Sequence, residues 1–202
     1  MSNPPEFPKL DSTTPEFWEV RYRADFTPWD AGGVPQQVRA FVAAQAKPLR
    51  TLVPGCGSGY EIACFAEAGW DVLGIDFSDA ALQRARQRLA DHGSHTALGD
   101  FFVWEAEQCY EALYERTFLC ALKPSLRPAY AVQAARLLGP GGLLFGYFYY
   151  DEKTGGPPFG ITLAELDSLL HAQFERLEVS SVPDSLPIFA GKERWEVWRK
   201  RR

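Results

Sequence analysis

The sequence is poor in the residues that mark metal sites and disulfide-bonded proteins. Of its 202 residues only four are cysteine and three are histidine. The cysteines follow no metal-ligand spacing, and each lies among apolar residues: Cys56, Cys64, Cys109 and Cys120. This pattern predicts no metal site and favours buried, reduced thiols in a cytoplasmic protein.

The sequence also lacks an excess of positive charge, a signal sequence and a long apolar run. Its net charge is -5 at pH 7. A nucleic-acid partner would require a basic face, so none is expected, and 199–202 is interpreted as a solvated basic end. The N-terminus is not basic and then apolar, and no run is long enough to cross a bilayer. We expect a cytoplasmic monomer with no membrane partner.

The most informative stretch present runs from Leu52 to Tyr60 and reads L-V-P-G-C-G-S-G-Y. An apolar run ends there in a glycine-rich turn that opens into a helical pattern. The backbone can therefore approach a ligand closely, and the first helical N–H groups face that ligand. A second apolar run ends at Asp76, about 20 residues after the first glycine, where dinucleotide folds place the acid that binds a ribose hydroxyl. The first hypothesis is a cofactor that contains a nucleoside.

The spacing of the glycines narrows the choice of cofactor. Dinucleotide-binding proteins show G-x-G-x-x-G, whereas Gly55, Gly57 and Gly59 form G-x-G-x-G. No lysine follows that could serve a nucleoside triphosphate, so a P-loop is excluded. A glycine turn that only lets a strand pack on a helix is the alternative. The acid at the expected distance makes that alternative weaker.

Strand and helix patterns alternate along the chain and predict an α/β fold. Strands are expected at 50–54, 70–76, 95–98, 110–116, 143–150, 174–179 and 195–198. Helices are expected at 15–22, 35–46, 60–68, 78–90, 124–138 and 162–171, with a sharp turn at 139–142. Because no repeat or second domain is evident, we expect one domain over residues 1–202. Its sheet would be doubly wound, Rossmann-like and mostly parallel, with an antiparallel C-terminal strand.

Several motifs occur in one order along the chain. They are F-W-E-x-R-Y from Phe17, P-W-D from Pro28, V-P-G-C-G from Val53, Y-E-R-T-F-L-C-A-L from Tyr114, L-R-P-A-Y from Leu126 and G-G-P-P-F from Gly155. Together they resemble the thiopurine S-methyltransferase family of class I methyltransferases, which use S-adenosyl-L-methionine. The tail, with P-D-S-L-P from Pro183 and G-K-E from Gly191, is similar to the thiol and halide methyltransferases of the "harmless to ozone layer" branch. The resemblance covers almost the whole chain after the first ten residues.

The resemblance implies that three aromatic residues close the site from the N-terminal side. Trp18, Tyr22 and Trp29 would line the cofactor, within a lid segment formed by residues 1–34. A sulfonium cation is favoured over an aromatic face, which gives the two tryptophans a physical reason to be there. Alternatively, they are core aromatics that join the N-terminal segment to the sheet. Many family members have tryptophan where this chain has Tyr22.

The resemblance places the other cofactor contacts after predicted strands, at Gly55, Gly57, Asp76, Phe77, Asp100 and Phe101. The Gly55 backbone would approach the methionine part of S-adenosyl-L-methionine, Gly57 would be a further cofactor contact, and Asp76 would hold the ribose hydroxyls. Asp100 and Phe101 would flank the adenine, although Asp100 could also be a plain turn residue. Open α/β sheets bind ligands beyond the carboxyl ends of their strands, so these positions could converge.

The same resemblance places Arg116 at the methyl-transfer site, as a catalytic and cofactor-binding residue. A soft anion such as a thiolate or iodide needs no strong base, and a nearby guanidinium would lower the pKa of a thiol. We therefore expect no obligatory catalytic base, with Tyr22 or Tyr147 as possible assistants. An ion pair of Arg116 with Glu115 or Glu111 is the structural alternative.

The expected function is transfer of a methyl group from S-adenosyl-L-methionine to a small thiol, with S-adenosyl-L-homocysteine as product. The thiopurine branch has arginine at position 116 and the halide-methylating plant branch has tyrosine, so a halide acceptor stays open. Two other hypotheses are a nicotinamide-dependent dehydrogenase, disfavoured by the glycine spacing, and a binding protein for S-adenosyl-L-methionine without catalytic activity.

Overall fold

The computed structural model describes residues 5–189 and 191–202, and its centre is a seven-stranded sheet. The strands are β1 (Thr51–Pro54), β2 (Val72–Asp76), β3 (Thr96–Leu98), β4 (Tyr110–Arg116), β5 (Leu138–Tyr149), β6 (Phe174–Ser181) and β7 (Glu193–Lys200). Their order is β3-β2-β1-β4-β5-β7-β6. The first five strands are parallel, and β7 runs antiparallel to both of its neighbours. The predicted mostly parallel α/β sheet is confirmed.

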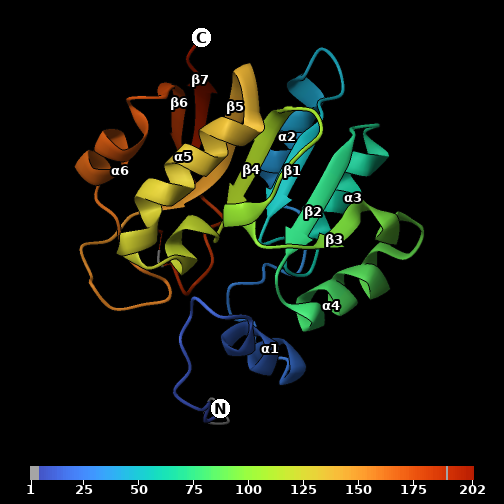
Figure 1. Cartoon of the computed structure of the whole chain (residues 1–202), viewed down its shortest axis with the longest axis vertical. Coiled ribbons are helices and arrows are strands. Elements are labelled where there is room, and N and C mark those ends of the chain that lie inside the picture. The colour runs from blue at the N-terminus through green and yellow to red at the C-terminus, as the bar shows by residue number, and fades with distance from the viewer. Residues whose placement is uncertain (1–4, 190) are drawn as a thin grey trace.

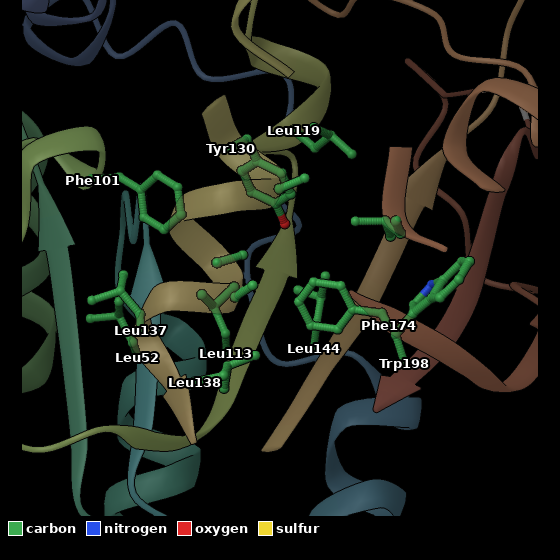
Figure 2. Close-up of a cluster of buried hydrophobic side chains, with 14 of the residues drawn as sticks. Leu52, Phe101, Leu113, Leu119, Tyr130, Leu137, Leu138, Leu144, Phe174 and Trp198 are labelled. Carbon is green, nitrogen blue, oxygen red and sulfur yellow. The ribbon is translucent and has the colours of Figure 1, made fainter. Parts of the chain in front are cut away.

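Helices cover both faces of this sheet (Figure 1). They are α1 (Pro15–Arg23), α2 (Gln36–Ala44), α3 (Tyr60–Glu67), α4 (Asp79–Leu89), α5 (Arg127–Leu137) and α6 (Leu163–Leu170). Side chains of α5 and α6 pack on one face with Leu113 and Leu144, as Figure 2 shows for part of this cluster. Side chains of α2, α3 and α4 pack on the other face with Tyr114 and Phe145. Neighbouring strand residues thus serve opposite faces, as the two-residue period of a strand requires.

One predicted feature is wrong at the start of β5. The sharp turn expected at 139–142 lies inside the strand, because Tyr110 pairs with Leu138 and Ala112 pairs with Leu143. The intervening residues form a bulge, in which Gly141 adopts a φ of 76°. Glycine takes this left-handed conformation without strain, so the chain bulges and then resumes the same strand.

Helix α1 lies beyond the carboxyl ends of β1, β2 and β4 (Figure 1). Glu19 attaches it to the start of α4, where its Oε1 accepts hydrogen bonds from Ser78 Oγ at 2.9 Å and from the Ala80 amide at 3.0 Å. Arg84 adds an ion pair with Asp25. Residues 1–4 of the expected lid lie outside the described residues. Within the described part of the chain, no helix combines the length and apolarity that crossing a membrane would require.

Glu115, the second-last residue of β4, is a carboxylate with an exposure of only 1%. Its Oε1 accepts the amides of Phe118 at 3.0 Å and Leu119 at 2.9 Å, and its Oε2 accepts the Tyr130 hydroxyl at 3.0 Å. Burial raises the pKa of Glu115 to about 7, because desolvation outweighs these hydrogen bonds. The carboxylate therefore anchors the chain where it leaves β4.

This burial makes stability depend on pH. The ordinary pKa of glutamate, 4.5, applies to the unfolded chain, whereas the folded state holds the proton to about pH 7. The free energy of unfolding should therefore fall as the pH rises between these values, by up to about 3 kcal/mol. We expect Glu115→Gln to remove most of this fall, since an amide accepts the two N–H bonds without ionising. The difference between the free energies of unfolding measured in urea at about pH 5 and about pH 8 gives the size of this fall.

Glu111 provides the matched control at the start of the same strand. It is exposed and bonded to Lys47 at 2.5 Å, and this bond lowers its pKa. It is therefore ionised in both states above pH 5, and Glu111→Gln should keep the wild-type pH dependence. A Glu115→Gln variant with the same pH dependence as the wild type would contradict the assignment to Glu115.

Candidate functional site

A cavity of about 540 Å³, its open mouth included, lies beyond the carboxyl ends of β1 and β4. Its walls are the glycine-rich loop after β1, the loop after α1 and the end of β4. Five of the ten predicted site residues line it: Tyr22, Trp29, Gly55, Gly57 and Arg116. The other five do not: Trp18, Asp76, Phe77, Asp100 and Phe101.

Two glycines form the floor of this cavity and leave no room for larger residues. Gly55 and Gly57 adopt φ values of 58° and 52°. A Cβ atom on Gly55 would lie 2.5 Å from the Phe118 ring, and one on Gly57 would lie 2.5 Å from the Tyr22 hydroxyl. Glycine is thus required at both positions by the backbone conformation and by the packing of these two side chains.

Asp76 lies directly behind this loop and is bonded to it. Its Oδ2 accepts the Gly57 amide at 3.1 Å, and its Oδ1 accepts the Ser78 amide at 2.9 Å. The side chain is buried, and burial raises its pKa to about 6 although these N–H bonds oppose the rise. The structure therefore joins the predicted ribose-binding acid to the glycine loop at the end of β2.

Three aromatic rings gather over the cavity from the N-terminal side. Trp18 and Trp29 meet edge to face with centroids 5.4 Å apart, and Tyr22 and Trp29 do so at 6.0 Å. Trp18 also donates its Nε1–H to the Ser12 carbonyl at 3.0 Å. Trp29 and Tyr22 contact the cavity directly, whereas Trp18 supports Trp29 from behind. The cluster thus contains two residues that face the site and one half-buried tryptophan that lies outside its lining.

The residues predicted to flank adenine lie after β3, outside the cavity. Asp100 is exposed, and its Oδ1 accepts the Phe102 amide at 2.9 Å, which caps a short helical turn. Phe101 is buried in the core, with its ring 5.2 Å from that of Phe118. Phe118 in turn packs on Gly55, so Phe101 reaches the glycine loop only through this ring.

Arg116 ends β4 with a side chain that is 11% exposed. Its Nη1 lies 3.7 Å from Glu61 Oε1, and its guanidinium carbon lies 4.7 Å from the centre of the Tyr147 ring. The alternative prediction, an ion pair of Arg116 with Glu115 or Glu111, is wrong. Glu115 accepts two backbone amides and a tyrosine hydroxyl, and Glu111 binds Lys47. Within the described residues, Nη1 has no hydrogen-bond partner. A buried donor of this kind is available to a ligand.

Glu61 is not among the predicted site residues, yet it lines the cavity beside Arg116. Glu61 lies in the first turn of α3, on the side of the helix that carries the buried Ile62 and Phe65. An acidic residue on an otherwise apolar face of the helix was the sequence signal that could have identified Glu61 as a site residue. Asp30 was noted only within a motif, yet its Oδ2 accepts the Ser58 hydroxyl at 2.5 Å and joins the N-terminal loop to the glycine loop.

The tyrosines near the cavity are poor bases. Burial raises the pKa of Tyr22, with Asp76 adding to the rise, and burial likewise raises the pKa of Tyr147. Both phenols therefore stay protonated near neutral pH. Among residues 5–189 and 191–202, no group of three or more potential metal ligands occurs. In and beside the cavity, the structure therefore combines these two protonated phenols with two carboxylates and one guanidinium.

A family model described as thiopurine S-methyltransferase matches residues 13–201. The "probable thiol methyltransferase 2" of Arabidopsis thaliana is 32% identical over 190 residues, covering 91% of this chain and 84% of the relative. The thiocyanate methyltransferase 1 of the same plant is 30% identical with the same coverage. A thiopurine S-methyltransferase of Pseudomonas fluorescens is 29% identical over 85% of this chain and 86% of the relative.

Solved structures share the fold at lower identity. The CcbJ methyltransferase of Streptomyces caelestis aligns with a TM-score of 0.72 at 22% identity, over 96% of this chain and all of the other. A 1,6-didemethyltoxoflavin N1-methyltransferase of Burkholderia thailandensis, solved with S-adenosylhomocysteine, aligns with a TM-score of 0.75 at 19% identity, covering 98% and 94% of the two chains. At these identities the similarity concerns the fold.

Proposed function

The chain belongs to the thiopurine S-methyltransferase family, and from this premise we propose that it is an S-adenosyl-L-methionine-dependent enzyme that methylates a small thiol. The observation that carries the proposal is the convergence of a glycine floor, an aromatic cover and Arg116 on one cavity. That cavity lies beyond the carboxyl ends of the parallel strands, where open α/β sheets bind their ligands. The product would be S-adenosyl-L-homocysteine.

The residues of the cavity fit this cofactor. Gly55 and Gly57 line the cavity with backbone that carries no side chain, and Arg116 keeps an unpaired buried N–H group. The glycine backbone would hold the methionine part. We propose that Asp76, with Phe77 beside it, binds the ribose. Asp100 and Phe101 would flank the adenine. The three aromatic residues Trp18, Tyr22 and Trp29 would cover the cofactor. We propose one domain over residues 1–202, with 1–34 as its lid.

The cofactor supplies an electrophilic methyl group, and the chain supplies alignment and charge. Arg116 would stabilise the anionic form of the acceptor sulfur, because a buried guanidinium favours a nearby negative charge. The aromatic cover would exclude water and face the sulfonium cation. The raised pKa values of Tyr22 and Tyr147 support a reaction without an obligatory protein base.

A halide or another small soft anion is the second candidate acceptor, because the unpaired N–H of Arg116 would bind such an ion as well. We further propose a cytoplasmic monomer that acts on small molecules and not on nucleic acids or membranes. The net charge of -5 supports the absence of a nucleic-acid partner.

Two measurements test the proposed function. Calorimetry with S-adenosyl-L-homocysteine and with NAD should show binding of the first ligand alone. Turnover with S-adenosyl-L-methionine and a panel of thiols, thiopurines and iodide should give the highest kcat/KM with a thiol. Tight binding of NAD alone would contradict the cofactor, and no product with any acceptor would favour a binding protein without catalytic activity.

A further inference from the structure

The cavity contains more negative than positive side chains. Its lining includes two carboxylates, Asp30 and Glu61, and one guanidinium, Arg116. The proposed methyl donor carries two positive groups, the sulfonium and the α-ammonium, and one negative group, the α-carboxylate of its methionine part. The strand that leads into the glycine loop, Thr51–Pro54, contains no acid. Among the lining residues, Asp30 and Glu61 are therefore the candidates for a carboxylate that binds the ammonium.

Asp30 already uses both of its oxygens within the protein. Its Oδ2 accepts the Ser58 hydroxyl at 2.5 Å, and its Oδ1 accepts the Gly32 amide at 2.8 Å. These bonds hold the loop after α1 against the glycine loop. A ligand ammonium would have to compete with both of them, so Asp30 is suited to positioning the loop.

Glu61 is less completely bonded. Its Oε1 accepts the Tyr114 hydroxyl at 3.2 Å and lies 3.7 Å from Arg116 Nη1, which is an ion pair too long for a hydrogen bond. In the described part of the chain, Oε2 accepts no side-chain hydrogen bond. Burial raises the pKa of Glu61 even though Arg116 opposes the rise. The carboxylate is thus stabilised by one hydroxyl donor, the backbone N–H of its own residue and a cation beyond hydrogen-bond distance.

We propose that Glu61 binds the α-ammonium group of the methyl donor. The proposal rests on the proposed function and assigns a further residue to the same site. Glu61 belongs to the first turn of α3, directly after the glycine loop that would hold the methionine part. An ammonium would supply charge-assisted hydrogen bonds to this half-buried carboxylate.

The position of Glu61 also couples binding of the methyl donor to binding of the acceptor. The carboxylate would lie between two cations, the ammonium of the donor and the guanidinium of Arg116. Without the donor, Arg116 is the cation paired with the negative charge of Glu61. When the ammonium binds, both cations interact with that carboxylate. The guanidinium is then freer to stabilise an anionic acceptor, so the acceptor should bind more tightly once the donor is in place.

Two ligands that differ in the methionine part test the proposal. S-adenosyl-L-homocysteine contains the ammonium, whereas 5′-deoxy-5′-methylthioadenosine has the same adenosine and sulfur without the amino acid. By calorimetry, we expect Glu61→Gln to weaken binding of the first by about 10-fold to 100-fold, the loss of one charge-assisted contact. Binding of the second should stay within about twofold. The control Glu67→Gln, at the exposed end of α3, should change neither.

Other outcomes overturn the proposal. Equal weakening of both ligands would mean that Glu61 only shapes the cavity, and unchanged affinity for S-adenosyl-L-homocysteine would remove it from the donor site. If Glu61→Gln does not fold, Tyr114→Phe keeps the carboxylate but removes its hydroxyl donor. With that donor gone, the carboxylate depends more on the ammonium, so a selective gain in affinity for S-adenosyl-L-homocysteine supports the proposal, and an unchanged or lowered ratio of the two affinities overturns it. A wild-type protein that binds neither ligand would instead contradict the proposed function.

Discussion

Replacing Arg116 by alanine should lower kcat/KM for a thiol by about 100-fold to 1000-fold, the usual effect of removing a group that stabilises developing or reacting charge. The guanidinium is buried at the end of β4 with an unpaired Nη1, so a reacting anion there depends on it. The affinity for S-adenosyl-L-homocysteine should fall much less, by about 10-fold or less. Steady-state kinetics and calorimetry on the same preparation separate the two effects.

Two further variants control this experiment. Arg116→Lys keeps the charge without the planar fork, so it should retain part of the turnover. Arg50 lies ahead of β1, at the opposite end of the strand from the glycine loop, where it bonds to the Gln108 carbonyl at 2.9 Å. Arg50→Ala should therefore leave turnover unchanged. Full activity of Arg116→Ala would exclude this residue from the mechanism.

Replacing Gly55 by alanine should weaken binding of S-adenosyl-L-homocysteine by at least about 100-fold. The new methyl group would lie 2.5 Å from the Phe118 ring, at a φ of 58° that L-residues disfavour. The ring and the loop must then shift, and this shift would distort the loop that the cofactor would contact. Calorimetry measures the loss, with circular dichroism to verify the fold.

Gly141 offers a matched control for the backbone strain alone. It has a φ of 76° in the bulge of β5, and a Cβ atom there would meet nothing within 4 Å. Gly141→Ala should therefore cost stability, about 1 to 2 kcal/mol, and leave ligand affinity unchanged. If Gly55→Ala bound the ligand as well as Gly141→Ala does, the glycine loop would not be the cofactor floor.

The secondary structure could be predicted well because its signals are local. The helix expected at 78–90 begins after Ser78, whose hydroxyl caps it by accepting the Ala81 amide at 3.2 Å. The helix expected at 162–171 begins after Thr162, which forms a capping box with Glu165. The turn at 139–142 was wrong because the glycine signal is the same for a turn and for a bulge. The pairing of β4 with β5 decides between them.

The chain by itself determined the alternation of elements, the glycine floor and the acid at the end of β2, since each follows from neighbouring residues. Only the tertiary structure decided which charges meet. Arg116 pairs with Glu61 and not with its neighbour Glu115, because adjacent residues of β4 point to opposite faces of the sheet. Contacts between residues far apart in the sequence depend on how the strands and helices pack, and no local pattern specifies them.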